Sequence, residues 1–393
     1  METHKLIFHS RTAAESDWEC QRKRFYTNVY EGGIVKDNLT VDLFIGTVLH
    51  DGLAAIATAH RDTGKVDIST IAGISRKLVF DTIYEYHAQA YTDEKLPENS
   101  TEYLHAQEQS TLVEALLRGF YKHQWPALIA EYNIIVASEK EAIFPHDMSG
   151  KLNKKGPFVY MVKPDLLLEG QNGKVYFELK STGSKKLEWI TSWNNAIQVH
   201  GTAKAIEFTY NEAPLGTIIQ GMYKGSTMYG KFSSPLVYAY VGKGNPPFSK
   251  TTISPEFKYG LKRVPVWELE CGVSEYLDKF TPEQLSEQFP QTPIIFTKED
   301  MATDFFRQRA IRESDVLEAQ ENMELSEGIH KKFIMDHIFP QSFSKCTPSF
   351  GFPCQYERIC HGPAKENPLK MGFLKKDKSH QLPYKILAEE LLG

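Results

Sequence analysis

The sequence predicts an α/β fold, and three observations predict it. Apolar residues recur at helical spacing through most of residues 16–130. Short apolar runs of strand length follow between residues 133 and 180, and helical spacing returns at residue 187. The chain has 393 residues, of which 41% are hydrophobic and 24% charged. That composition is ordinary for a globular protein, and the length allows a large core without disulfide bonds.

The first third of the chain is predicted to be almost entirely helical. Ser16 and Asp17 are expected to cap an amphipathic helix over residues 16–30. Residues 40–60 place their apolar side chains on one helical face, and residues 60–130 continue with helical spacing between polar interruptions.

The middle of the chain is predicted to form a sheet. Residues 133–138 and 158–162 are β-like apolar runs. The next two runs, 165–168 and 174–180, are separated by a Gln-Asn-Gly turn, which predicts a hairpin. After these come a predicted helix over 187–208 and predicted strands at 217–223, 235–241 and 264–270.

The last quarter of the chain changes in character. Residues 299–335 are charged and have helical spacing, whereas Pro, Gly, Ser and Cys dominate from residue 340, where we expect little regular structure. No composition shift marks a clean boundary before that point. We therefore expect one domain over residues 1–393, with 60–130 as a helical insertion and 340–393 as a cysteine-bearing basic segment.

The charge balance excludes one class of protein. The chain has 45 basic and 50 acidic side chains, a net charge of −5, so it is not a strongly basic chromatin-type protein. A nucleic-acid enzyme needs only a basic patch. Residues 345–385 carry eight basic side chains against three acidic ones, and further basic clusters lie at residues 22–24, 151–155 and 185–186. These clusters could line a path for a phosphate backbone. The alternative is that they are scattered surface charges.

The sequence gives no sign of a membrane or export signal. No run approaches the roughly 18 apolar residues of a membrane-spanning helix. The first residues lack the basic-then-apolar pattern of a signal peptide. We therefore expect a cytoplasmic protein. No phosphate-binding Gly-x-x-x-x-Gly-Lys-Ser/Thr motif occurs, so no ATPase motor is expected.

The predicted hairpin carries two carboxylates and a lysine. Glu178 and Lys180 are two residues apart on one strand and therefore point to the same face, which Asp165 at the start of the neighbouring strand can reach. Carboxylates are the preferred ligands of Mg²⁺ or Mn²⁺, and a lysine beside the metal can orient an attacking water. The alternative is a solvated hairpin face. The apolar run 166–168 favours a buried strand, in which these charges need partners.

These residues resemble a known signature. Pro164-Asp165 followed by Glu178-Leu179-Lys180 is similar to the motif of PD-(D/E)XK nucleases. Upstream, Gly46-Thr47-Val48-Leu49-His50 resembles the G-x-x-x-H helix of the RecB-like branch. The resemblance implies that His50, Asp165 and Glu178 bind the metal and that Lys180 is catalytic.

Two further positions follow from this resemblance. Gln198 lies on the predicted helix after the lysine, where the family has Gln followed four residues later by Tyr; here Thr202 replaces the Tyr. The resemblance implies that Gln198 belongs to the catalytic set. A glutamate-bearing strand precedes the aspartate in the family, and either Glu139 or Glu141 fits that description.

The cysteines form a second pattern. Cys346, Cys354 and Cys360 cluster near the C-terminus, and Cys20 lies far away near the N-terminus. Clustered cysteines in a cytosolic protein favour a metal, and four thiolates bind zinc or an iron–sulfur cluster. The arrangement resembles iron–sulfur nucleases of the RecB-like branch, including AddB-type and CRISPR-associated members, although the Cys346-x7-Cys354 spacing is longer. The resemblance implies a [4Fe–4S] cluster, with zinc as the alternative. Cys271 is expected to be a core thiol.

Together these resemblances imply a fold and an activity. The fold would be restriction-endonuclease-like, a mixed central sheet flanked by helices with an iron–sulfur-stapled C-terminal segment. The activity would be metal-dependent hydrolysis of DNA, by an exonuclease acting on single strands or ends, with a helicase or recombinase as a candidate partner. Such a compact enzyme is compatible with a phage origin. The alternative is a nucleic-acid-binding or scaffolding protein without cleavage, and a sequence-specific restriction enzyme ranks third.

Overall fold

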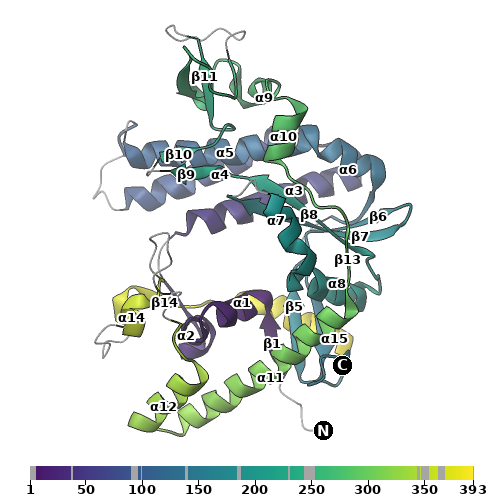
Figure 1. Cartoon of the computed structure of the whole chain (residues 1–393), viewed down its shortest axis with the longest axis vertical. Coiled ribbons are helices and arrows are strands. Elements are labelled where there is room, and N and C mark those ends of the chain that lie inside the picture. Colours follow the sequence, from purple (N-terminus) through teal and green to yellow (C-terminus); the bar gives the residue numbers. More distant parts are fainter. Residues whose placement is uncertain are drawn as a thin grey trace.

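The computed structural model describes residues 6–36, 39–89, 96–98, 100–137, 140–183, 187–228, 231–242, 253–342, 346, 354–361 and 368–392. These residues form a mixed α/β architecture, as the sequence predicts (Figure 1).

A five-stranded mixed sheet carries the predicted hairpin. Its strands are β3 (Asn133–Val136), β6 (Leu166–Gly170), β7 (Gly173–Thr182), β8 (Gly216–Tyr223) and β13 (Ile295–Phe296). Their order is β13-β8-β7-β6-β3. β7 and β8 run parallel, whereas the other neighbours run antiparallel.

β6 and β7 form the hairpin with a two-residue turn. Gly170 pairs with Gly173, whose φ of 122° is a conformation that only glycine adopts readily. Leu166, Leu167 and Leu168 are all buried. The strand is therefore covered on both faces, as the continuous apolar run predicts.

Helices cover one face of this sheet. They are α3 (Val41–Thr63), α4 (Ile68–Ala88), α5 (Thr101–His123) and α6 (Trp125–Glu131), which confirms the helical prediction for this part of the chain. Phe177 and Leu179 of β7 pack in the main core with Leu49 of α3 and Leu117 of α5. By length and composition α3 is apolar enough to cross a membrane, but its apolar residues pack in this core, as in the core helix of a soluble protein.

The opposite face of the sheet meets another helix. Tyr176 packs there with Leu167 and with Ile206 of α8 (Ile197–Tyr210). Because side chains alternate along a strand, Glu178 and Lys180 share the face of Tyr176. α7 (Leu187–Ser192) connects β7 to α8 across this face.

A second sheet brings the N-terminus into the fold. It contains β1 (Ile7–Ser10), β4 (Ala142–His146) and β5 (Phe158–Val162) in the order β1-β5-β4. β1 runs parallel to β5, and Ser10 pairs with Met161. The sequence predicted β5 but neither β1 nor β4. The remaining strands pair as β2 (Ile34–Lys36) with β14 (Phe373–Lys375), β9 (Ser226–Met228) with β10 (Lys231–Ser233), and β11 (Tyr238–Val241) with β12 (Lys262–Pro265).

The two ends of the chain lie together in the lower half of Figure 1. The helices of this region are α1 (Arg11–Glu19), α2 (Gln21–Arg24), α11 (Glu299–Glu324), α12 (Gly328–Ile338), α14 (Glu357–His361) and α15 (Leu382–Leu392). Two short helices, α9 (Gly272–Leu277) and α10 (Pro282–Gln288), precede α11 in the chain. Phe25 and Tyr26 share a core with Val316, Tyr356 and Phe373. Residues more than three hundred positions apart therefore pack directly.

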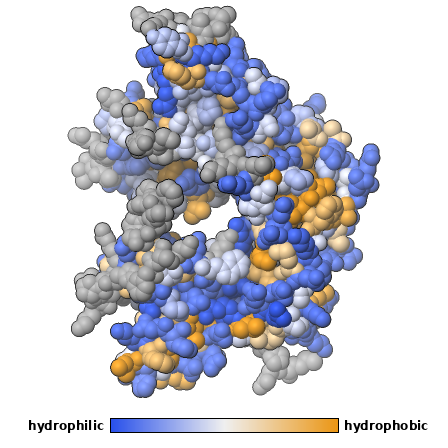
Figure 2. All heavy atoms as spheres, viewed as in Figure 1, coloured by the Kyte–Doolittle hydropathy of each residue, from blue (hydrophilic) through white to orange (hydrophobic). Residues whose placement is uncertain are grey.

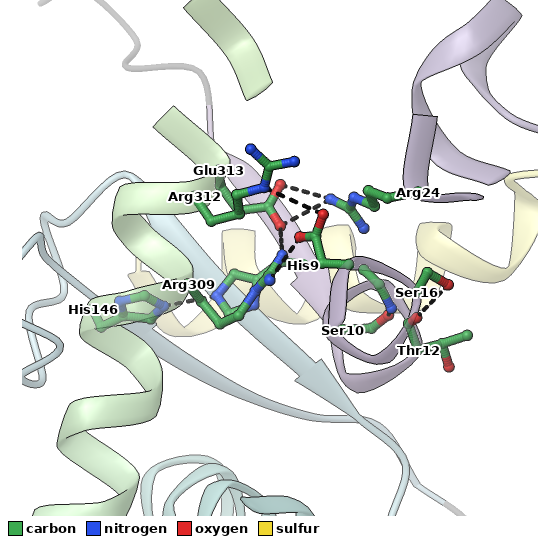
Figure 3. Close-up of polar contacts among 11 residues, drawn as sticks. His9, Ser10, Thr12, Ser16, Arg24, His146, Arg309, Arg312 and Glu313 are labelled. Carbon is green, nitrogen blue, oxygen red and sulfur yellow. Dashed lines mark hydrogen bonds and ion pairs between the residues drawn. The ribbon is translucent and has the colours of Figure 1, made fainter. Parts of the chain in front are cut away.

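Buried ion pairs hold α1 and α2 against α11 (Figure 3). Arg309 donates to Asp17 at 2.8 Å, and Arg24 lies 2.8 Å from both carboxylate oxygens of Glu313. Arg309 also donates to Glu313 at 2.5 Å. All four side chains are buried. Each buried charge has an opposite partner, which is the condition for tolerating it.

The structure corrects the start and end of the first predicted helix. It begins at Arg11 rather than Ser16, because the Ser10 hydroxyl accepts a hydrogen bond from the backbone N–H of Ala13 and caps it. It is interrupted at Cys20, whose backbone is extended, and residues 21–29 continue as α2 and a π-helical turn over Phe25–Val29.

Three other predictions need correction. The helix predicted over 299–335 is two helices, separated by residues 325–327, and Gly328 has a φ of 56°. The strand predicted at 264–270 ends at Pro265, where a 3₁₀ turn over Val266–Glu268 begins. Little regular structure was expected after residue 340, but α15 is a full helix, because Tyr384 and Ala388 pack against Ile143 and Val159 of the second sheet.

An opening passes through the molecule. Figure 2 shows it in the space-filling view, and in Figure 1 α1 lies on one side of it while α3 and α7 lie on the other. Of these helices, α3 carries the predicted site residue His50 on the part of the rim that the structure describes.

Candidate active site

The hairpin brings Asp165 and Glu178 to the same place. Asp165 immediately precedes β6, and its Oδ2 accepts a hydrogen bond from the backbone N–H of Leu179 at 2.6 Å. Asp165 is 3% exposed and Glu178 is 4% exposed. The partner strand of the hairpin therefore anchors the first carboxylate next to the second. Neither side chain lies on a solvated face, so that alternative is wrong.

His50 of α3 reaches the same two carboxylates. Its Nδ1 lies 2.7 Å from Asp165 Oδ1. Burial lowers the pKa of His50, but the charge of Asp165, their hydrogen bond and the charge of Glu178 together outweigh burial and raise it. The contact is therefore that of a histidine hydrogen-bonded to a carboxylate, and the helix that carries His50 is locked to the hairpin.

Lys180 and Gln198 meet on one oxygen of Glu178. The Lys180 ammonium donates to Glu178 Oε1, and Gln198 Nε2 donates to the same atom at 2.7 Å. Burial raises the pKa of Glu178; Lys180 opposes this rise, and Asp165 adds to it. The structure thus brings all five sequence-predicted residues of this site together.

The other oxygen of Glu178 has no partner among the described residues. Glu178 Oε2 is buried and makes no hydrogen bond within the part of the chain that the structure describes. A buried carboxylate oxygen without a partner is strongly unfavourable. Across the described ranges, no three His, Cys, Asp or Glu side chains already stand as a metal-holding group. The unpartnered oxygen, beside a second buried carboxylate, is nevertheless the donor that a hard divalent cation takes.

Sequence analysis missed one residue of the site. Arg11, the first residue of α1, donates from Nη1 to Gln198 Oε1 across 187 positions of the chain. The predicted helix start at Ser16 left Arg11 outside any element. Ser10 before Arg11, a good N-cap residue, was the signal that could have placed it at a helix start.

The four cysteines of the second pattern lie in one region. The backbone N–H of Ser342 donates to Cys20 Sγ at 3.4 Å, and Cys346 Sγ donates to the carbonyl of the same residue at 3.5 Å. The backbone N–H of Cys354 donates to the carbonyl of Cys346 at 3.1 Å. Burial raises the pKa of Cys360 to about 12; Arg22 opposes the rise, and the other three thiols add to it. The other three thiols are thus close enough to Cys360 to affect its ionisation.

The other candidates lie elsewhere. Cys271 is buried in the main core, as expected. Glu139 lies outside the described residues. The backbone carbonyl of Glu141 accepts a hydrogen bond from the hydroxyl of Tyr210 at 2.9 Å. Arg22 and Arg24 do not line a path for a phosphate backbone, because both are buried. Arg22 donates to the carbonyl of Phe339 at 2.7 Å and pairs with Asp336 at 2.5 Å. Arg24 pairs with Glu313.

Comparison with known proteins adds no relative. No model of a known protein family matches the chain, and no curated protein matches it. The function is therefore inferred from the geometry of the site.

Proposed function

We propose that this chain is a metal-dependent deoxyribonuclease of the RecB-like PD-(D/E)XK type. The observation that carries the proposal is the unpartnered Oε2 of Glu178, buried beside Asp165, His50 and Lys180. Burying two carboxylates together, with one oxygen left without a hydrogen-bond donor among the described residues, does not stabilise the fold. This arrangement is well explained by a cation that binds there.

The proposed ion is Mg²⁺ or Mn²⁺. Glu178 Oε2 and the Asp165 carboxylate would hold it, with His50 as a third ligand once it exchanges its contact with Asp165. When bound, such an ion lowers the pKa of a water and stabilises charge on a scissile phosphate. Oxygen and imidazole donors suit both ions.

The chain's own residues would position the reactants. Lys180 is held by Glu178 on the face where the carboxylates meet, so its ammonium can orient the attacking water and offset the charge that develops on the phosphate. Gln198 keeps Glu178 Oε1 occupied and thereby keeps Oε2 directed away from both donors.

The opening favours a strand or an end as substrate. α1, α3 and α7 border it, and the first two of these helices supply Arg11 and His50 (Figure 1). A single strand or a strand end could lie in the opening beside the site. We therefore propose an exonuclease that acts on DNA single strands or ends, in the cytoplasm, alone or beside a helicase or recombinase.

The cysteines would form a structural centre. Cys20, Cys346, Cys354 and Cys360 supply four thiols in one region, which fits a [4Fe–4S] cluster, with zinc as the alternative. The cluster would staple the C-terminal segment to α1 and α2 of a restriction-endonuclease-like fold. Nothing in the site calls for electron transfer.

The test is a cleavage assay with protein purified without oxygen. End-labelled single- and double-stranded DNA are incubated with Mn²⁺ and either the wild type, Lys180→Ala or the control Lys174→Ala. Lys174 lies on the same strand but pairs with Glu212 instead. We expect the wild type and the control to release nucleotides and Lys180→Ala to release none.

Two outcomes would contradict the proposal. If Lys180→Ala cleaves like the wild type, the assigned site is wrong. If no protein cleaves while the wild type still binds DNA, the chain is the nucleic-acid-binding protein that forms the alternative. Discrete bands from a plasmid would instead indicate a sequence-specific endonuclease.

A further inference from the structure

The amide of Gln198 can face its neighbours in two ways. Its oxygen accepts hydrogen bonds and its nitrogen donates them, and the two atoms have nearly the same size. Only one orientation places a donor against Glu178 Oε1. In the other orientation a carbonyl oxygen would face a carboxylate oxygen, which is repulsive.

Arg11 decides between these orientations. A guanidinium has five N–H donors and no acceptor, so it can face only the oxygen of the amide. Arg11 Nη1 donates to Gln198 Oε1, and Gln198 Nε2 therefore faces Glu178. Gln198 is buried, which leaves it few other partners.

The consequence reaches the metal-binding oxygen. Glu178 Oε1 receives donors from both Gln198 and Lys180, and Oε2 receives none among the described residues. This asymmetry fixes the rotation of the carboxylate. If the amide of Gln198 turned, Oε1 would lose one donor and the carboxylate could rotate away from the metal position.

The position of Arg11 is itself fixed by contacts that do not involve the site. Ser10 caps α1 and pairs with Met161 in the second sheet. At the other end of the helix, Asp17 is held by Arg309 and by Arg312, at 2.8 and 3.2 Å. Arg11 thus reaches the site from a rigid element.

We propose that Arg11 is a positioning residue of the nuclease site: it sets the amide orientation of Gln198 and, through it, the carboxylate of Glu178 that binds the divalent cation. This inference rests on the proposed function, because it assigns a role within the same site. Arg11 acts through Gln198 and does not itself bind the metal.

The first experiment measures Mn²⁺ binding to the protein by calorimetry, without DNA, together with kcat and KM for cleavage. Arg11→Lys keeps a side chain that can only donate, and Arg11→Gln introduces an amide that can present either atom. We expect Arg11→Lys to stay close to the wild type. We expect Arg11→Gln to lose about tenfold or more in Mn²⁺ affinity and in kcat, with KM unchanged, as for other outer partners of metal ligands.

The second experiment tests the route through Gln198. In a double-mutant cycle, Arg11→Ala should lower Mn²⁺ affinity in the wild-type background and have no further effect in the Gln198→Ala background. The control is Arg307→Gln, since Arg307 is an exposed arginine of α11 that pairs within its own helix with Asp304. It should behave like the wild type, and melting curves for each variant identify any that fails to fold.

The outcomes separate this inference from the proposed function. If the wild type binds Mn²⁺ and cleaves DNA, but Arg11→Gln matches it, the positioning role is overturned and the nuclease stands. Equal losses of Mn²⁺ affinity from Arg11→Ala in both backgrounds would mean that Arg11 does not act through Gln198, and a change in KM alone would mean that Arg11 contacts the substrate directly; either result overturns the positioning role. If the folded wild type neither binds Mn²⁺ nor cleaves, the proposed function itself fails.

Discussion

The Asp165 carboxylate accepts a hydrogen bond from the backbone N–H of Leu179 at 2.6 Å, so the two strands of the hairpin are joined at the point where the two buried carboxylates meet. The second strand thus orients the first carboxylate through its main chain and supplies the second through its side chain. This relationship makes the carboxylate pair a property of the hairpin itself. The residues that complete the site come from helices far away in the sequence.

Replacing Glu178 by Gln should separate stability from metal binding. Burial raises the pKa of Glu178, so its charge is unfavourable in the metal-free fold. We expect Glu178→Gln to keep or raise the melting temperature without metal and to lose the increase that Mn²⁺ gives the wild type. That increase corresponds to about 2.7 kcal/mol at a Mn²⁺ concentration of 100 Kd. The control is Glu169→Gln, because the Glu169 side chain is exposed at the end of β6. A full Mn²⁺ response in Glu178→Gln would contradict the metal assignment.

Acid should destabilise the fold through a buried histidine pair. His9 and His146 lie Nε2 to Nε2 at 2.7 Å, and both are buried (Figure 3). Burial lowers the pKa of His146 to about 4, and burial, His146, Arg309 and Arg24 lower that of His9. The unfolded chain therefore binds protons that the fold excludes, from about pH 6.5 downward to about pH 4 for His146.

The free energy of unfolding should accordingly fall as pH falls through that window. Each histidine contributes at most about 1.4 kcal/mol per pH unit. Urea unfolding at pH 7, 6 and 5 measures the slope. His146→Gln should reduce it, whereas His330→Asn on exposed α12 should not. A stability that is flat or rises on acidification in the wild type would show that the pair does not exclude protons.

Breaking the buried ion pairs should destabilise the fold strongly. Glu313→Ala removes a carboxylate that both Arg24 and Arg309 contact. Removing one partner of a buried pair costs about 3–5 kcal/mol. Asp81→Ala, which removes an exposed pair with Lys77 on α4, should cost about 0.5 kcal/mol or less. Denaturant unfolding measures both. A loss below about 1 kcal/mol for Glu313→Ala would mean that water replaces the carboxylate.

Replacing Cys360 should remove the proposed cluster. We expect Cys360→Ala, purified without oxygen, to contain little iron and sulfide, and to melt at a lower temperature because the two ends of the chain lose their staple. Cys271→Ala should keep the metal content of the wild type, since Cys271 lies in the main core. Zinc instead of iron in the wild type would select the alternative metal. An unchanged melting temperature in Cys360→Ala would argue against any metal at these cysteines.

The hairpin site was predictable because its pattern is local. The alternation of Glu178 and Lys180 with buried apolar residues depends only on the period of a strand. His50 could be placed through the resemblance of its helix to a known motif. In both cases a few neighbouring residues carry the information.

The rest depended on contacts between distant segments. β1 has four residues, too few for a pattern, and it becomes a strand by pairing with β5. β4 contains Pro145, which argues against a strand within a sheet, but β4 lies at the edge of the order β1-β5-β4, where proline is tolerated. Ser10 could have marked the start of α1, but the place of Arg11 beside Gln198 depends on the pairing of β1 with β5, which the sequence does not show.

The ion pair between Asp17 and Arg309 spans 292 positions. This separation affects the order in which the elements fold while the chain is being synthesised. A ribosome releases the N-terminus first, so α1 waits for α11 to emerge before it can be locked in place. The hairpin and α3 are complete much earlier. In a nascent chain the two buried carboxylates would therefore come together before α1, which carries Arg11, is locked in place.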